Sequence, residues 1–141
     1  RSSCRWLATG LRAAAGGIEV FVSLARDGNE RQKECAAAAL NNDDNKAAIA
    51  AAGGIEVLVS LARDGNERQK VRAAGVLRNL AMNDDNRVAI AAAGGVEVLV
   101  SLARDGTKGQ KVRAAGVLRN LAMNDDNRVL WNLAVNDDNS V

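Results

Sequence analysis

Apolar residues follow a helical spacing along most of this chain. In the segment 96–104 they recur at i, i+3, i+4 and i+7, the spacing of one helix face, at Val96, Leu99, Val100 and Ala103. A second stripe of this kind lies in the segment 110–123 and consists of Ala114, Val117, Leu118, Leu121 and Ala122. Alternation with a period of two is absent and alanine is abundant, which disfavours strands. The pattern therefore predicts α-helices over 96–104 and 110–123.

Polar residues and glycines predict where the helices start and stop. The run from Asp84 to Asn86 precedes an apolar segment, and Asp and Asn side chains accept hydrogen bonds from the free amides of a helix start. A short helix is thus predicted over 86–93. Gly94 and Gly95 permit a sharp bend after it, and Gly106 follows the last turn of the middle helix. One structural unit is therefore predicted to contain three helices.

The same unit occurs twice in nearly identical form. Residues 42–82 and 83–123 differ at six positions, namely Lys46/Arg87, Ala47/Val88, Ile55/Val96, Asn66/Thr107, Glu67/Lys108 and Arg68/Gly109. Such a tandem period is typical of a stacked array, in which each unit buries its apolar face against its neighbours. A catalytic site is normally built once from unlike residues. We therefore predict a scaffold or recognition surface and no enzyme.

The ends of the chain depart from this period. We expect a single solenoid over residues 1–141, with units at about 1–41, 42–82 and 83–123 and a partial unit at 124–141. In the first unit, residues 34–40 match 71–77, but the next four residues of the full unit are missing, which predicts a shorter third helix. In the last unit, 124–129 leads directly into 129–135, which matches 117–123. The array is therefore expected to be truncated at both ends.

Composition narrows the range of chemistry. The 141 residues are 48% hydrophobic but only 2% aromatic, so the core must be built from Ala, Leu, Val and Ile. The chain has no histidine, the usual general base and metal ligand near neutral pH, and we predict no cofactor. Ser23, Ser60 and Ser101 occupy equivalent positions without a histidine partner. The NDDN clusters lack the ligand spacing of a calcium loop and are interpreted as helix caps.

Charge and cysteine content bear on partners and compartment. The net charge is +2, and acidic and basic residues are interleaved rather than gathered in a basic stripe with aromatics, so no nucleic-acid partner is expected. No apolar run approaches the ~20 residues of a transmembrane helix. Cys4 and Cys35 lie far apart, and we interpret them as buried thiols of an intracellular protein, cytoplasmic or nuclear. The sequence leaves membrane association through residues ahead of Arg1 open.

The three-helix unit resembles the armadillo repeat. The resemblance is carried by the Gly-Gly bend, the buried second helix and the third helix ending in Leu-x-Asn-Leu-Ala, over 52–65, 70–81 and their copies 93–106 and 111–122. The glycine pair and the asparagine favour armadillo over the HEAT repeat, which has a similar period. The resemblance implies an all-α fold, a right-handed α-α superhelix of three-helix repeats, with about three repeats here.

The resemblance also implies a function. Armadillo arrays hold an extended peptide in a concave groove lined by their third helices, and asparagines there bond to the peptide backbone. Asn79 and Asn120 occupy those ladder positions, and Asn132 is a third candidate. Four arginines on the predicted third helices suit an acidic or phosphorylated ligand, namely Arg72, Arg78, Arg113 and Arg119. We therefore expect a protein or peptide partner that is extended and acidic.

Other roles stay open at the level of sequence. The nuclear-import receptors of the family place a tryptophan four residues before the ladder asparagine, where this chain has Gly75 and Gly116, so nuclear import is disfavoured. These glycines are interpreted as sites where the next helix or a ligand backbone comes close. The resemblance also allows a vacuole-membrane scaffold or a ubiquitin-ligase arm. A different alternative is a structural fragment that self-associates through exposed terminal faces.

Overall fold

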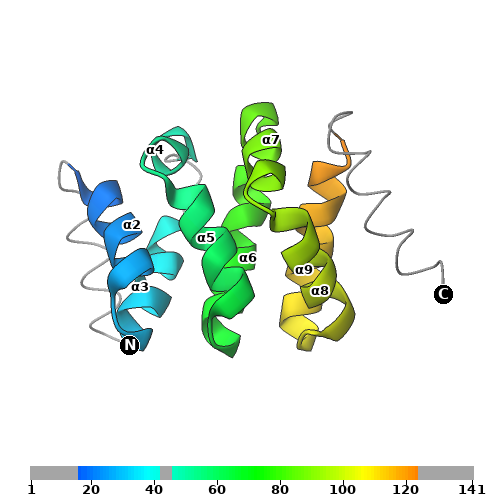
Figure 1. The fold of residues 1–141 in the computed structure, drawn as a ribbon, viewed down its shortest axis with the longest axis horizontal. Helices are drawn as coiled ribbons and strands as arrows, with labels where there is room; N and C mark the ends of the chain where they lie inside the picture. Colours follow the sequence, from blue (N-terminus) through cyan, green and yellow to red (C-terminus); the bar gives the residue numbers. More distant parts are fainter. Residues whose placement is uncertain (1–15, 42–45, 124–141) are drawn as a thin grey trace.

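The chain folds into a row of stacked α-helices. The computed structural model describes residues 16–41 and 46–123, which contain eight helices and no strand. The first two are α2 (Gly17–Asp27) and α3 (Glu30–Leu40). Two triplets follow, α4 (Lys46–Ala51), α5 (Gly54–Asp64) and α6 (Glu67–Leu80), then α7 (Asp84–Ala92), α8 (Gly95–Asp105) and α9 (Lys108–Leu121). Figure 1 shows the units side by side, which confirms the predicted three-helix repeat.

Side-chain caps mark where α7 and the third helices begin. At α9, the Thr107 hydroxyl accepts a hydrogen bond from the Gln110 amide, and the Gln110 side chain accepts one from the Thr107 amide. At α7, Asn83 Oδ1 accepts a hydrogen bond from the Asn86 amide at 3.1 Å. Both helices therefore begin two residues earlier than predicted, at Asp84 and Lys108. The interpretation of the NDDN run at 83–86 as a helix cap is confirmed.

The two glycines of each bend serve different purposes. Gly94 has φ 82°, in the left-handed region that residues with a Cβ rarely adopt, and it turns the chain between α7 and α8. Gly95 allows close packing, because a Cβ there would lie 2.6 Å from Cγ2 of Ile90 and 2.7 Å from its carbonyl oxygen. Gly53 and Gly54 repeat this arrangement at the start of α5, where Ile49 takes the place of Ile90. The bend thus fixes how each short helix meets its second helix.

The core runs without interruption through the row. The third helices α3, α6 and α9 pack against one another in order, and the second helices α2, α5 and α8 do the same. The largest fully buried apolar side chains are Phe21, Leu40, Ile49, Leu58, Leu77, Leu80, Ile90, Leu99, Leu121, Val22 and Val59. All of them belong to one cluster that extends from α2 to α9. Helix α3 has 11 residues where α6 and α9 have 14, so the prediction of a shorter third helix in the first unit is confirmed.

The cysteines do not follow the interpretation made from the sequence. Cys35 on α3 is buried at 7% exposure but is disulfide-bonded, so its interpretation as a free thiol is wrong. Cys4 lies outside the described residues. A disulfide at Cys35 does not favour a reducing compartment. Among the described helices, none alone is long and apolar enough to cross a membrane, and α7 with α8 has the length and composition only when the two are joined across their 83° bend.

Candidate functional site

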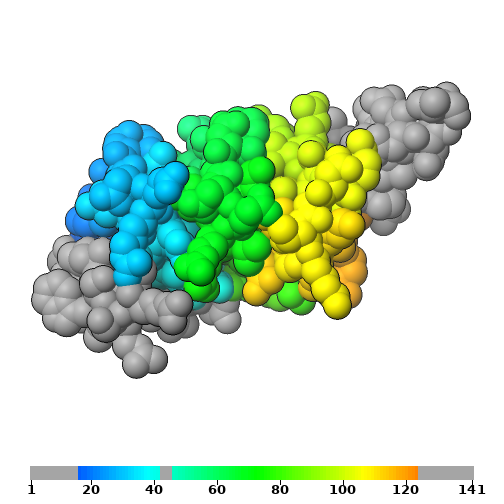
Figure 2. All heavy atoms as spheres, turned by 90° about the horizontal axis from the view of Figure 1, so that it is seen from below, coloured from blue at the N-terminus to red at the C-terminus, as the bar shows by residue number. Residues whose placement is uncertain are grey.

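The predicted site residues that the structure describes all lie on α6 and α9. Figure 2 shows the side of the row at which each second helix leads into its third helix. The units follow one another from blue and cyan through green to yellow. Arg72, Arg78 and Arg119 are exposed and Arg113 is half-buried. Within residues 16–41 and 46–123, none of these four guanidinium groups takes part in an ion pair. Their positive charge is therefore not neutralised by the carboxylates around them.

The two ladder asparagines bond to the unit before them. Asn79 is half-buried, and its Nδ2 donates a hydrogen bond to Oδ1 of Asn41, which ends α3. Asn120 is only 6% exposed, and its Nδ2 donates to the carbonyl oxygen of Arg78 at 3.2 Å. An asparagine amide has two N–H groups and one acceptor oxygen, so each of these bonds uses one donor and leaves the others. Asn132 lies outside the described residues.

Arginine side chains cross between the third helices and lie over the glycines. A Cβ placed on Gly116 of α9 would lie 3.0 Å from Cδ and Nε of Arg78, which reaches across from α6. In the opposite direction, Arg113 of α9 lies over Gly75 of α6, with Nε 3.6 Å and Cδ 3.7 Å from the corresponding Cβ position. The predicted close approach at these glycines is thus made by arginines of the neighbouring unit.

A pocket opens where the first turns of the third helices meet. It has a volume of about 380 Å³ and is lined by Glu34, Glu67, Arg68, Val71, Arg72, Thr107 and Arg113. Both of its carboxylates have partners. Glu34 Oε1 lies 3.7 Å from Nη1 of Arg68, and Glu67 Oε2 accepts a hydrogen bond from Nε2 of Gln110 at 3.2 Å. Gln110 is neutral, so Glu67 keeps its charge, while Arg72 and Arg113 form no ion pair with any described carboxylate.

Two buried glutamines lie in the first turns of α6 and α9, and their role was not predicted from the sequence. Gln69 and Gln110 are 3% and 1% exposed. Besides closing its capping box, each donates from Nε2 to the first residue of the preceding third helix, Gln69 to the Glu30 carbonyl at 2.8 Å and Gln110 to the Glu67 carbonyl at 3.2 Å. The repeated spacing of Asn or Thr followed three residues later by Gln signals the capping box, although not the bond across units.

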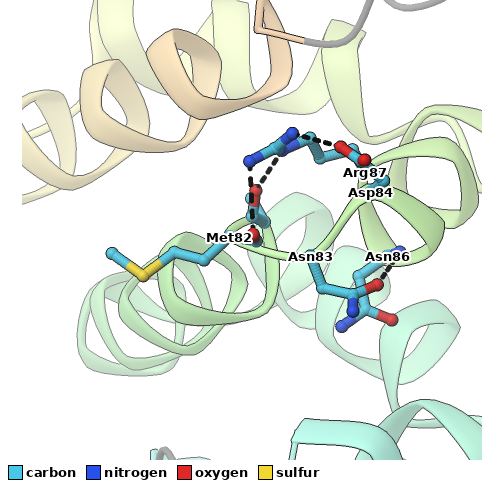
Figure 3. A network of polar contacts seen from close by, with 6 residues as sticks. Met82, Asn83, Asp84, Asn86 and Arg87 are labelled. Carbon is cyan, nitrogen blue, oxygen red and sulfur yellow. Dashed lines mark hydrogen bonds and ion pairs between the residues drawn. The ribbon is translucent and has the colours of Figure 1, made fainter.

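An arginine near the start of α7 closes the end of α6 (Figure 3). Arg87 donates from Nε to the Ala81 carbonyl at 2.6 Å and from Nη2 to the Met82 carbonyl at 3.2 Å. Its Nη1 lies 2.5 Å from Asp84 Oδ1. The last carbonyls of a helix have no intrahelical partner, so a guanidinium there satisfies them. This network is structural and lies apart from the pocket.

Stacked three-helix units, joined by buried amides and lined along one side by arginines, define a solenoid scaffold. The chain matches the family model described as Armadillo/beta-catenin-like repeat over residues 42–82 and 83–123. It belongs to this armadillo family, as its sequence suggested. Comparison with curated protein sequences finds no match.

Solved structures agree with the family assignment. Two engineered proteins are each 35% identical to the chain, with TM-scores of 0.75 and 0.79; the alignments cover 84% of this chain and 54% and 31% of theirs. A designed armadillo repeat protein in complex with the peptide (KR)4 is 21% identical, with a TM-score of 0.80, over 94% of this chain and 62% of its own. The chain thus spans less than two thirds of each of these proteins.

Proposed function

We propose that this chain is a protein-binding module that holds an extended acidic peptide along α6 and α9. The observation that carries the proposal is a set of four guanidinium groups on these helices that form no ion pair with the carboxylates of residues 16–41 and 46–123, at Arg72, Arg78, Arg113 and Arg119. Carboxylate and phosphate groups form charge-assisted hydrogen bonds with guanidinium. Asn79 and Asn120 each use one N–H group in a bond to the preceding unit. We assign the remaining N–H group and the oxygen of each amide to hydrogen bonds with the backbone of the peptide.

The charge of the ligand is the specific part of the proposal. A designed armadillo protein has been solved with the basic peptide (KR)4, so the fold itself accommodates a peptide of that charge. In the present chain, like charges would face each other if a basic peptide lay along the arginines, and such a juxtaposition disfavours binding. The same fold therefore selects the opposite ligand charge through the residues on its third helices.

The proposal is tested with three labelled peptides of about twelve residues, which extend to about 40 Å. They alternate serine with Asp, with Lys or with Gln, and their fluorescence anisotropy is followed as the chain is titrated at low salt. We expect the Asp peptide to bind most tightly and to be released as salt is added, since surface charges are screened. Tighter binding of the Lys peptide, or equal binding of all three, would refute an acidic ligand.

We also infer a role without catalysis. Ser60 and Ser101 are exposed at equivalent positions of α5 and α8, so the same hydroxyl is presented by each unit rather than assembled once with a base. The broader roles known for armadillo proteins, such as a vacuole-membrane scaffold or a ubiquitin-ligase arm, require segments beyond the repeats themselves. What this chain contributes to any of them is the binding surface.

A second candidate function is self-association through the end of the row. Ala74 on α6 is fully buried, whereas the equivalent Ala115 on α9 is exposed, and Val112 next to it is 61% exposed. This is the face on which a further unit stacks in a solenoid. Light scattering over a range of concentrations tests the idea. A dimer that forms with increasing concentration and is lost in Val112→Glu supports it, and a monomer throughout refutes it.

A further inference from the structure

We propose that the pocket between α6 and α9 is a subsite for one anionic side chain of the ligand, a carboxylate or a phosphate, held between Arg72 and Arg113. The inference rests on the proposed function, because it assumes an acidic peptide along these helices. It goes further by assigning one position of that peptide to one pocket. With a volume of about 380 Å³, the pocket has room for a side chain.

The pocket has more positive than negative side chains in its lining. Its two carboxylates are engaged, Glu34 with Arg68 and Glu67 with Gln110. Because the Gln110 amide is neutral, Glu67 keeps its negative charge, and the three arginines and two glutamates of the lining leave the pocket with a net charge of +1. Neither Arg72 nor Arg113 forms an ion pair with a described carboxylate. Arg113 is also held in place, because its stem lies over Gly75 and its Nη1 donates to the Gly109 carbonyl at 3.4 Å. A guanidinium that is positioned in advance loses less freedom when it binds an anion.

The two near-identical units differ in sequence at the start of the third helix, beside the pocket. Three of their six differences are consecutive, Asn66/Thr107, Glu67/Lys108 and Arg68/Gly109, and they form the cap and first residues of the third helix. Thr107 lines the pocket. The exchange of Glu67 for Lys108 replaces a negative charge by a positive one at the start of α9. Differences between repeats thus collect where an anion would enter.

The equivalent interface one unit earlier, between α3 and α6, has an ion pair at this position. There Arg68 faces Glu34 and pairs with it at 3.7 Å. Between α6 and α9, the same two positions are Gly109 and Val71, separated by 3.9 Å between the Cγ2 of Val71 and a Cβ placed on Gly109. The loss of that arginine leaves the space in which the Arg113 guanidinium lies. Cys35 stands where Arg72 would be required, so among the described units the arginine pair is present once.

The test uses the labelled Asp–Ser peptide and single substitutions in the full chain. Arg72→Gln and Arg113→Gln should each weaken binding about tenfold, as expected for loss of a charge-assisted hydrogen bond. Arg63→Gln is the matched control, since Arg63 is an exposed arginine on α5 outside the pocket, and it should change affinity less than about twofold. Melting curves by circular dichroism verify that every variant is folded.

The variant Gly109→Arg distinguishes binding of the peptide in the pocket from general attraction by the positive charge of the chain. It restores the residue found in the second unit, raises the net charge by one and fills the space beside Arg113. We expect it to weaken binding of the acidic peptide. If it strengthens binding, or if Arg63→Gln weakens binding as much as Arg113→Gln does, the subsite is overturned while the proposed function stands. If the wild-type chain does not bind the acidic peptide in preference to the basic one, both proposals fail.

The source of the anion is distinguished with the same chain. A second Asp–Ser peptide carries phosphoserine at its central serine, and inorganic phosphate is added as a competitor. Tighter binding of the phosphopeptide, with the gain lost in Arg113→Gln, assigns the subsite to phosphoserine. Equal binding of the two peptides, both weakened by Arg113→Gln, assigns it to a carboxylate. Displacement of either peptide by millimolar inorganic phosphate in the wild type but not in Gly109→Arg supports the same pocket.

Discussion

The glycines of the third helices differ in what lies above them. A Cβ on Gly75 would meet Arg113 at ordinary contact distances of 3.6 and 3.7 Å, whereas a Cβ on Gly116 would lie 3.0 Å from two atoms of Arg78. Glycine inside a helix is less favourable than alanine by up to ~1 kcal/mol. The increase in the free energy of unfolding on replacing glycine by alanine should therefore depend on whether the neighbouring arginine must move.

Gly75→Ala is expected to raise the free energy of unfolding by about 0.5–1 kcal/mol, because it improves helix propensity without a clash. Gly116→Ala should give a smaller gain, since the Arg78 side chain must shift to admit the methyl group. Urea unfolding followed by circular dichroism measures both values. A larger gain at Gly116 than at Gly75 would contradict the close contact with Arg78.

Asn120 makes a buried bond to the preceding unit that the sequence did not predict. Its amide is almost fully buried and bonds to the Arg78 carbonyl. Asn120→Ala should therefore lower the free energy of unfolding by about 1–2 kcal/mol, through a lost hydrogen bond and an unsatisfied carbonyl. Asn79→Ala should cost less, because Asn79 is half-buried and water can replace it. Equal melting temperatures for Asn120→Ala and the wild type would show that the bond contributes nothing to stability.

At the scale of the element, buried glutamines tie each third helix to the one before it. Gln110 closes the capping box of α9 and bonds to Glu67 of α6, so one side chain fixes both the start of the helix and its distance from its neighbour. Gln32 of α3 is exposed, and its side chain bonds, among the described residues, only within its own capping box. The two residues therefore offer a matched comparison between capping alone and capping with a bond across units.

Gln110→Met keeps the volume of the side chain but removes its polar groups. It is expected to lower the free energy of unfolding by about 2 kcal/mol, since the Thr107 amide and the Glu67 carbonyl both lose a partner. Gln32→Met should cost about 1 kcal/mol or less, because it affects a single cap. Chemical unfolding of the two variants measures the difference. If they are equally destabilised, the bond between units carries no stability of its own.

The helices could be predicted from the sequence because their signals are local. The apolar spacing on α8, the glycine pair before it and the asparagine cap of α7 each depend on residues close in the chain. Contacts between units could not be predicted in this way. The bond of Asn120 to the Arg78 carbonyl, the position of Arg113 over Gly75 and the pocket arise only when two third helices stack. The candidate arginines were found from the sequence, but not which two of them share a pocket.

At the scale of the whole molecule, stability depends on how many faces are covered. Ala74 on α6, which packs against α9, is fully buried, while the equivalent Ala115 on α9 is exposed beside Val112. In a solenoid each interface contributes approximately independently to stability. Among the described helices, α9 therefore lacks the stabilisation that α6 gains by packing against a following third helix.

Inserting one further copy of residues 83–123 after Met123 should raise the melting temperature by several degrees, since a new interface buries Ala115 and Val112. It should also duplicate the pocket, because the new third helix brings Gly109 and Arg113 against α9. Differential scanning calorimetry measures the first effect, and the number of acidic peptides bound per chain measures the second. An unchanged melting temperature would contradict a stacked array.

The glutamine bonds between units also affect how such a gene can change in length. Each bond joins a side chain of one unit to a backbone carbonyl of the unit before it, at equivalent positions of the two described units that carry it. Unequal crossing-over that removes or adds one whole repeat rejoins an equivalent donor to an equivalent acceptor. Heritable variation in copy number is thus tolerated by the fold, while the three altered residues ahead of Gln110 mark which junction carries the specialised pocket.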